Sequence, residues 1–304
     1  MGFRMTETPP PRSSEVPAEP PSHDEDAEDR PRANRRRTLR GRTIAVVPTL
    51  FTLGNLLCGF LAVFVASRPM DTPMAFGWTP LTCAAVFIFV GQIADALDGR
   101  VARLTRSTSD LGEQLDSMAD MVTFGVAPAF ILVQIIGVQA PYLSDTGDTF
   151  YDRLGLAIAA IYVACVGLRL ARFNIEIEDA STKSHLFFDG LPSPGAAGAV
   201  AGMALLHQHV WATGNASFGA SVAAYVLLGA TLLCALAMVS RVRYVHVMNK
   251  YVRGRAPFLT VAMAVVVVLL LLVWPQPAIA GGFVAYAVSG PASAALRQWR
   301  GPQA

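Results

Sequence analysis

The sequence predicts an all-α polytopic membrane protein with about eight transmembrane helices. Of its 304 residues, 53% are hydrophobic and only 15% are charged, whereas soluble domains carry about 25% charged residues. Long apolar runs, rather than the net charge of +2, define this class. The same composition excludes a disordered protein, a coiled coil and a nucleic-acid-binding protein.

Eight apolar segments predict the transmembrane helices, because a helix needs about 20 apolar residues to cross a bilayer. The last segment is the weakest, since Gly281, Gly282, Gly290 and Pro291 interrupt it. An even number of crossings would place both termini on one side of the membrane. The segments are 44–66, 80–97, 117–138, 154–173, 194–212, 218–239, 257–275 and 278–296.

The distribution of basic residues predicts the orientation, because cytoplasmic loops carry an excess of Lys and Arg. With the N-terminus inside, 18 of the 24 Lys and Arg residues fall in inward-facing segments. Only Arg68 and Arg153 fall in outward loops, and the other four lie in residues 1–32. We therefore expect both termini in the cytoplasm. The Arg- and Ala-rich composition favours a bacterial inner membrane.

Four carboxylates lie in or beside the second and third apolar segments: Asp95, Asp98, Asp116 and Asp120. Each would cost about 2.5–3.5 kcal/mol at the bilayer centre on insertion scales, so they must face a polar cavity, a cation or one another. Spacings of three and four place each pair on one helix face. Two facing helices would bring all four together, and such hard oxygen ligands suit Mg²⁺ or Mn²⁺ in a two-ion arrangement.

Two other interpretations of these carboxylates remain. They could form a structural ion-pair network with Arg100, Arg103 and Arg106, or they could line the ion path of a transporter. Transporters often contain inverted repeats, and residues 150–304 hold no second copy of the aspartate pattern.

The stretch from Asp95 to Asp120 reads D-x-x-D-G-x-x-A-R-x8-G-x-x-x-D-x-x-x-D. It resembles the motif of the CDP-alcohol phosphatidyltransferase family, and all eight fixed positions are filled. The resemblance implies a six-helix transmembrane core, a CDP-linked lipid bound at the cytoplasmic face, and commonly a homodimer. Two C-terminal helices would then be additional to the core.

The same resemblance implies roles for individual residues. Asp120 would contribute to the metal site and act as the catalytic base on the acceptor hydroxyl. The four aspartates would bind the metal. Contact with the CDP-lipid is implied for Gly99, Ala102, Arg103, Gly112, Thr52 and Asn55. For the last two, the alternative is hydrogen bonding between helices.

Further stretches resemble the phosphatidylserine synthase branch, including PTLFTLGNLLCGF at 48–60 and FDGLPSPGAAG at 188–198. This branch joins CDP-diacylglycerol and L-serine to give phosphatidylserine and CMP. We expect Arg169, Arg172 and Asn174 to bind serine, because a carboxylate favours Arg. The two arginines could instead be positive-inside anchors or bind a lipid phosphate. Glycerol phosphate, inositol phosphate or another alcohol are alternative acceptors.

The chain is therefore expected to have three regions. Residues 1–42 form a disordered acidic, Pro-rich tail, which ends in a basic juxtamembrane segment at 33–42 that can bind anionic lipid. The tail's first 32 residues contain seven Pro and eight Asp or Glu. Residues 43–256 form the CDP-alcohol phosphatidyltransferase core, and residues 257–304 form additional transmembrane helices.

Overall fold

The computed structural model divides the chain into two units, 1–43 and 44–304, and the description below concerns the second together with the helical residues 33–43. The expected tail, residues 1–32, lies outside the described residues. Part of the predicted span 257–275 does so too. The described residues are 33–105, 110–143, 150–179, 187–212, 218–240, 242–245, 266 and 268–299.

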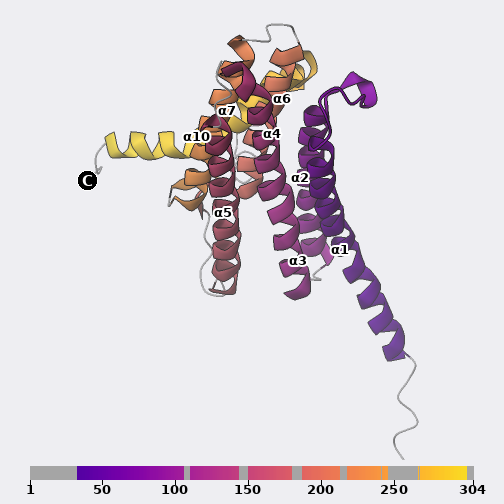
Figure 1. Ribbon diagram of the computed structural model, residues 1–304. Coiled ribbons are helices and arrows are strands. Elements are labelled where there is room, and N and C mark those ends of the chain that lie inside the picture. The colour runs from indigo at the N-terminus through magenta and orange to yellow at the C-terminus, as the bar shows by residue number, and fades with distance from the viewer. Residues whose placement is uncertain are drawn as a thin grey trace, which may run out of the picture. The chain divides into compact units, whose positions relative to one another are not determined.

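Helices make up almost all of the described chain (Figure 1). In chain order, the elements are α1 (Ala33–Ala66), the 3₁₀-helix η1 (Ala75–Gly77), α2 (Pro80–Thr105), α3 (Asp110–Asp120), the π-helix η2 (Met121–Val126), α4 (Ala127–Leu143), α5 (Phe150–Asp179), β1 (Phe187–Asp189), α6 (Ser193–Ala212), α7 (Phe218–Val239), β2 (Arg243–Val245) and α10 (Pro275–Trp299). Residues 268–273, just before α10, are also helical.

The predicted class of an all-α polytopic membrane protein is confirmed. Five helical stretches are long and apolar enough to cross a membrane: Thr49–Ala66, Pro80–Val101, Leu111–Gly137, Phe150–Ile175 and Ser221–Val239. The spans expected at 194–212 and 278–296 do form helices, α6 and α10, but these are not among the five. A short antiparallel ribbon of β1 and β2, paired at Phe188 and Tyr244, is the one departure from all-α structure in the described residues.

Local sequence explains where several helices begin. Thr79 precedes α2, and its hydroxyl accepts a hydrogen bond from the Thr82 backbone N–H at 3.1 Å, which caps the helix. Pro80 then occupies the first turn, where its missing N–H costs nothing. At the N-terminal end, α1 begins at Ala33, so the basic juxtamembrane segment 33–42 is helical. Its Arg residues favour this, because Arg is a good helix former.

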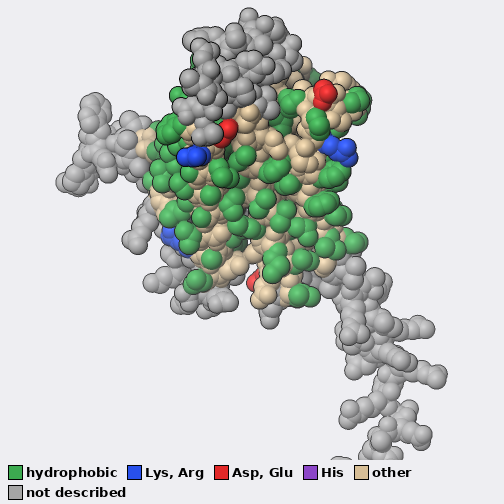
Figure 2. All heavy atoms as spheres, viewed as in Figure 1, with side chains coloured by type: hydrophobic (Ala, Val, Ile, Leu, Met, Phe, Trp, Pro, Cys, Tyr) green, Lys and Arg blue, Asp and Glu red, His purple; other side chains and the backbone are tan. Residues whose placement is uncertain are grey.

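Large apolar side chains remain on the surface of the helices, as expected of a protein surrounded by lipid. Leu156, Leu168 and Leu233 are 61%, 62% and 67% exposed. Hydrophobic side chains cover most of the described surface visible in Figure 2, and the few visible charged groups lie toward its upper and lower margins. This pattern is typical of a membrane-embedded protein.

Helix α6 occupies the middle of the bundle and packs against α2, α4, α7 and α10. It is rich in small residues, and Ala196, Ala197 and Ala201 have no exposed surface. Three glycines form the face that meets α10. A Cβ on Gly195 would lie 2.8 Å from the Tyr286 ring, and a Cβ on Gly202 would lie 3.0 Å from the Ala280 Cα. Glycine therefore lets α10 pack directly on α6.

Candidate active site

Three of the four predicted aspartates meet where α2 faces α3. Asp95 lies on α2, and Asp116 and Asp120 lie one turn apart at the end of α3. Each offers a carboxylate oxygen, and these oxygens all lie within 4.8 Å of one another. Asp120 is buried, at 8% exposed, and the other two are half-buried. The spacing of the aspartates in the sequence predicted this convergence.

Asp98, the fourth aspartate, is also buried but faces a different helix. Its carboxylate accepts a hydrogen bond from the hydroxyl of Thr52 on α1. It shares a helix face with Asp95, one turn away, so it lies next to the group of three without belonging to it. The predicted convergence of four carboxylates is thus observed for three.

Helix α1 contributes a second hydrogen bond to the acidic group. The side-chain Nδ2 of Asn55 donates to Oδ1 of Asp120 at 3.0 Å, and Asn55 is completely buried. Thr52 and Asn55 are three residues apart and therefore lie on one face of α1. Both make the helix-to-helix hydrogen bonds that were the alternative to nucleotide contact. Each of these bonds ends on a predicted metal ligand.

The glycines of the motif lie beside the carboxylates. Gly99 follows Asp98 directly on α2, and Gly112 lies one turn before Asp116 on α3; both are half-buried. Ala102 and Arg103 belong to α2, and their side chains lie outside what the structure describes. The arrangement leaves these four residues on the two helices that carry the acidic group.

The three residues expected to bind serine lie toward the C-terminal end of α5, and two of them, Arg169 and Asn174, contact different elements. Arg169 is buried, at 9% exposed, and its Nη1 lies 3.2 Å from where a Cβ would stand on Gly190. Asn174 Nδ2 donates to the Ser117 hydroxyl of α3 at 3.0 Å, directly beside Asp116 in the chain. Arg172 is half-buried. Asn174 is thus tied to the helix of the acidic group, and Arg169 is near the entry to α6.

Sequence reasoning did not predict two residues that join the surrounding elements by hydrogen bonds. Gln92, one turn before Asp95, donates through Nε2 to the Pro194 carbonyl at 2.7 Å and joins α2 to the start of α6. Tyr244 donates to the Ala287 carbonyl of α10 at 2.9 Å, and burial raises the pKa of Tyr244 to about 12. Gln92 could have been identified from the sequence, because it is a polar residue inside an apolar run. Tyr244 ends the stretch SRVRY at 240–244, which resembles the same branch of the family as the stretches at 48–60 and 188–198.

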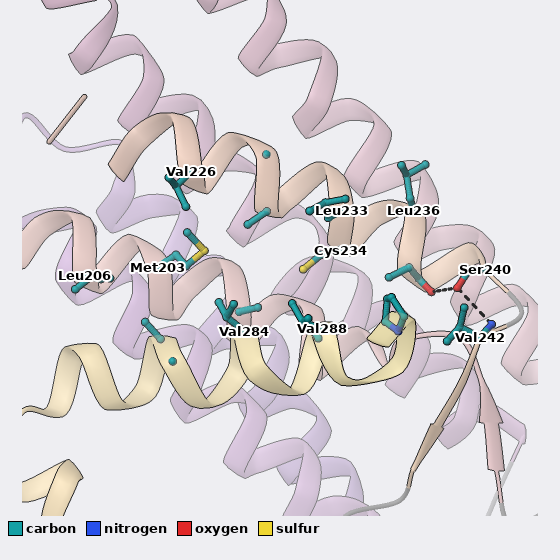
Figure 3. A pocket seen from close by; sticks show the side chains of 18 of the residues that line it. Met203, Leu206, Val226, Leu233, Cys234, Leu236, Ser240, Val242, Val284 and Val288 are labelled. Carbon is teal, nitrogen blue, oxygen red and sulfur yellow. Dashed lines mark hydrogen bonds between the residues drawn. The ribbon is translucent and has the colours of Figure 1, made fainter. Parts of the chain in front are cut away.

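A large apolar cavity of about 870 Å³ lies between α6, α7 and α10, away from this chemistry (Figure 3). Met203, Val226, Leu233 and Val288 are among the side chains that line it. The Ser240 hydroxyl in its lining donates to the Ala237 carbonyl at 2.8 Å. Among the residues that the structure describes, no carboxylate or cation lines the cavity, so the acidic group is the better candidate for a reaction at phosphate.

Comparison with known proteins agrees with the motif. The sequence model of the CDP-alcohol phosphatidyltransferase family matches residues 45–227. A protein of Helicobacter pylori strain J99, named CDP-diacylglycerol–serine O-phosphatidyltransferase, is 34% identical over 198 residues, which is 65% of this chain and 70% of the relative. Proteins with the same name are 34% identical in Bacillus subtilis (49% of this chain, 69% of the relative) and 41% identical in Saccharomyces cerevisiae (45% and 46%).

These matches confirm the resemblance inferred from the aspartate motif, and they cover the helices that carry the acidic group. The chain belongs to the CDP-alcohol phosphatidyltransferase family.

Proposed function

We propose that this protein is a CDP-diacylglycerol–serine O-phosphatidyltransferase, which makes phosphatidylserine and CMP from CDP-diacylglycerol and L-serine. The observation that carries the proposal is the meeting of Asp95, Asp116 and Asp120 within the family's motif. The names of the relatives favour serine as the acceptor.

The acidic group suits a divalent cation. Carboxylates with oxygens within 4.8 Å repel one another when ionised, and a cation relieves that repulsion. Hard oxygen ligands favour Mg²⁺ or Mn²⁺. Asp95, Asp98, Asp116 and Asp120 would hold the metal, with two ions per site. When bound, the metal neutralises the charge that builds on the diphosphate during transfer.

Asp120 acts as the base in this proposal. It takes the proton of the serine hydroxyl, whose oxygen attacks the phosphatidyl phosphorus. A new P–O bond forms to serine, the P–O bond to the CMP phosphate breaks, and CMP leaves with the electron pair. Asn55 fixes one oxygen of the Asp120 carboxylate, which restricts the rotation of the group. Such restriction keeps a base within hydrogen-bond reach of its substrate.

Other residues bind the two substrates. Gly99, Ala102, Arg103 and Gly112 line the CDP group, where glycine allows close backbone approach and Arg pairs with phosphate. Arg169 and Arg172 bind the serine carboxylate together with Asn174. These three candidates all lie on α5, which reaches the acidic group through the Asn174–Ser117 hydrogen bond.

The charge distribution, with its excess of basic residues in the inward-facing segments, supports the orientation in this proposal, in which the active site and both termini lie on the cytoplasmic side. The Arg- and Ala-rich composition supports a bacterial inner membrane, and the family resemblance supports a homodimer.

One assay tests the acceptor. Purified protein is incubated with CDP-diacylglycerol, Mn²⁺ and, in turn, radiolabelled serine, glycerol phosphate and inositol phosphate. We expect a labelled lipid and release of CMP with serine alone. A labelled product with a phosphorylated acceptor, and none with serine, would assign the enzyme to another branch of the family. No CMP release with any acceptor would refute the transferase.

A further inference from the structure

A π-helix follows the proposed base without a break. η2 spans Met121–Val126 and joins α3, which ends at Asp120, to α4. π-helices are rare, since each widened turn weakens the regular hydrogen-bond pattern, and they occur frequently at functional sites. The predicted span 117–138 therefore contains an irregularity one residue beyond Asp120.

Two hydrogen bonds made by buried hydroxyls attach this π-helix to the neighbouring helices α5 and α1. On one side, Tyr162 of α5 donates to the Phe124 carbonyl at 3.0 Å. On the other, the hydroxyl of Thr123 donates to the backbone carbonyl of Asn55 on α1 at 2.8 Å. Tyr162, Phe124, Thr123 and Asn55 have no exposed surface. The π-helix is thus attached to α5 and α1 by hydrogen bonds that water does not compete for.

Two glycines bring the backbones of α1 and α2 against Thr123. A Cβ on Gly59 of α1 would lie 2.8 Å from the Thr123 Cα. A Cβ on Gly91 of α2 would lie 2.6 Å from the Thr123 Cγ2 and 2.9 Å from the Asn55 Oδ1. Real Cβ atoms do not make contacts this short, so α1, α2 and η2 meet at a point that only glycine permits.

Asn55 links this meeting point to the carboxylate. Its backbone carbonyl accepts from Thr123, and its side-chain Nδ2 donates to Asp120. The other end of the amide, Oδ1, is buried without a hydrogen-bond partner among the described residues. Among the described residues, Asp120 is therefore the hydrogen-bond partner of the Asn55 side chain, and the Thr123 hydroxyl is a side-chain partner of the Asn55 backbone carbonyl.

We propose that Thr123 is a positioning residue, whose hydroxyl fixes Asn55 so that the Asn55 amide holds Asp120 where it meets Asp95 and Asp116. Asp120 and Thr123 are three residues apart, and Asn55 binds both, which closes a ring across α1 and the junction of α3 with η2. The role of Thr123 in turnover rests on the proposed function, whereas its role in the geometry of the acidic group does not.

The test compares three variants of the full-length protein. Thr123→Val removes the hydroxyl and keeps the branched shape, and Thr123→Ser keeps the hydroxyl. The control is Thr231→Val in α7, where an equally buried hydroxyl donates to the Leu227 carbonyl at 2.8 Å. We expect Thr123→Val to lower kcat about tenfold to hundredfold with little change in the KM for CDP-diacylglycerol. Thr123→Ser and Thr231→Val should retain the kcat of the unmodified protein.

A second measurement does not depend on activity. Mn²⁺ is titrated into each purified variant without substrate and followed by electron paramagnetic resonance. We expect Thr123→Val to weaken Mn²⁺ binding about tenfold to hundredfold, as changes behind metal ligands do, and Thr123→Ser to restore it. Equal kcat and equal Mn²⁺ affinity in Thr123→Val and Thr231→Val would overturn the proposal. An unmodified protein that binds Mn²⁺ and releases no CMP would refute the proposed function, and the binding comparison would still decide the role of Thr123.

Discussion

The contacts of α1 with α2 and α3 differ in kind from the contacts of α6 with α10. In the first region, Thr52 and Asn55 hydrogen-bond across helices to buried carboxylates. In the second, Gly195 and Gly198 of α6 face the rings of Tyr286 and Phe283. Directional bonds fix the orientation of a group, whereas apolar contacts fix only the distance between helices. The first region is therefore suited to holding reactive side chains in a fixed orientation, and the second is suited to packing one helix against another.

Both regions use glycine, and the neighbour of the glycine differs. Gly91 faces Thr123 in a π-helix, which is fixed on two sides by hydrogen bonds. Gly195 faces the edge of an aromatic ring, which can shift when its helix adjusts. An added methyl group should accordingly have different consequences in the two places.

Removal of the metal should have the largest effect. Treatment with excess EDTA should reduce CMP release below detection, because the carboxylates cannot stabilise a diphosphate without a cation. Addition of Mn²⁺ or Mg²⁺ should restore it. Full activity of protein that retains no metal by elemental analysis would contradict the metal site.

Loss of the base should come next. Asp120→Asn should lower kcat by about 10²–10⁴-fold, the usual contribution of general base catalysis, while CDP-diacylglycerol binding stays measurable. Asp152→Asn is the matched control, because Asp152 lies exposed in the first turn of α5. Near-normal turnover of the Asp120 variant would refute its assignment as the base.

Gly91→Ala should lower both stability and turnover. The added Cβ meets Thr123 and Asn55, so we expect a loss of about 1–3 kcal/mol of folding free energy from overpacking, together with a lower kcat. Gly54→Ala on α1 is the control, because no atom lies within 4 Å of its added Cβ. Thermal unfolding in detergent and CMP release measure the two effects. A Gly91→Ala protein with lowered Tm and unchanged kcat would remove the distinction between the two regions.

Gly195→Ala should have the smallest effect on function. Its added Cβ would lie 2.8 Å from a Tyr286 ring atom, so the Tm should fall while the kcat of the folded protein is retained. Gly281→Ala, with nothing within 4 Å, should lower neither. If Gly195→Ala instead lowers kcat as much as Gly91→Ala does, the α6–α10 contact contributes to the site directly.

The sequence predicted five of the eight spans because a long apolar run is enough to specify a membrane-crossing helix, whereas the predicted spans 194–212 and 278–296 form helices that are not among the five. It predicted the meeting of Asp95 with Asp116 and Asp120 because spacing defines a helix face. It could not show which helix Asp98 faces, or that Arg169 and Asn174 contact different elements, since both depend on how the helices are rotated against one another. The π-helix after Asp120 was not predictable either, because partners from α1 and α5, distant in the chain, hold it.

The packing of α10 on α6 has a practical consequence for the design of truncated versions of the protein. The family match ends at residue 227, which invites a minimal fragment without the C-terminal helix. Such a fragment would expose the glycine stripe of α6, and a longer one that keeps β2 but not α10 would leave the Tyr244 hydroxyl without its Ala287 acceptor. Because Gln92 ties the start of α6 to α2, beside Asp95, a loosened α6 would disturb the helix that carries the first aspartate. Shortened versions intended for crystallisation or screening should therefore keep residues 275–299.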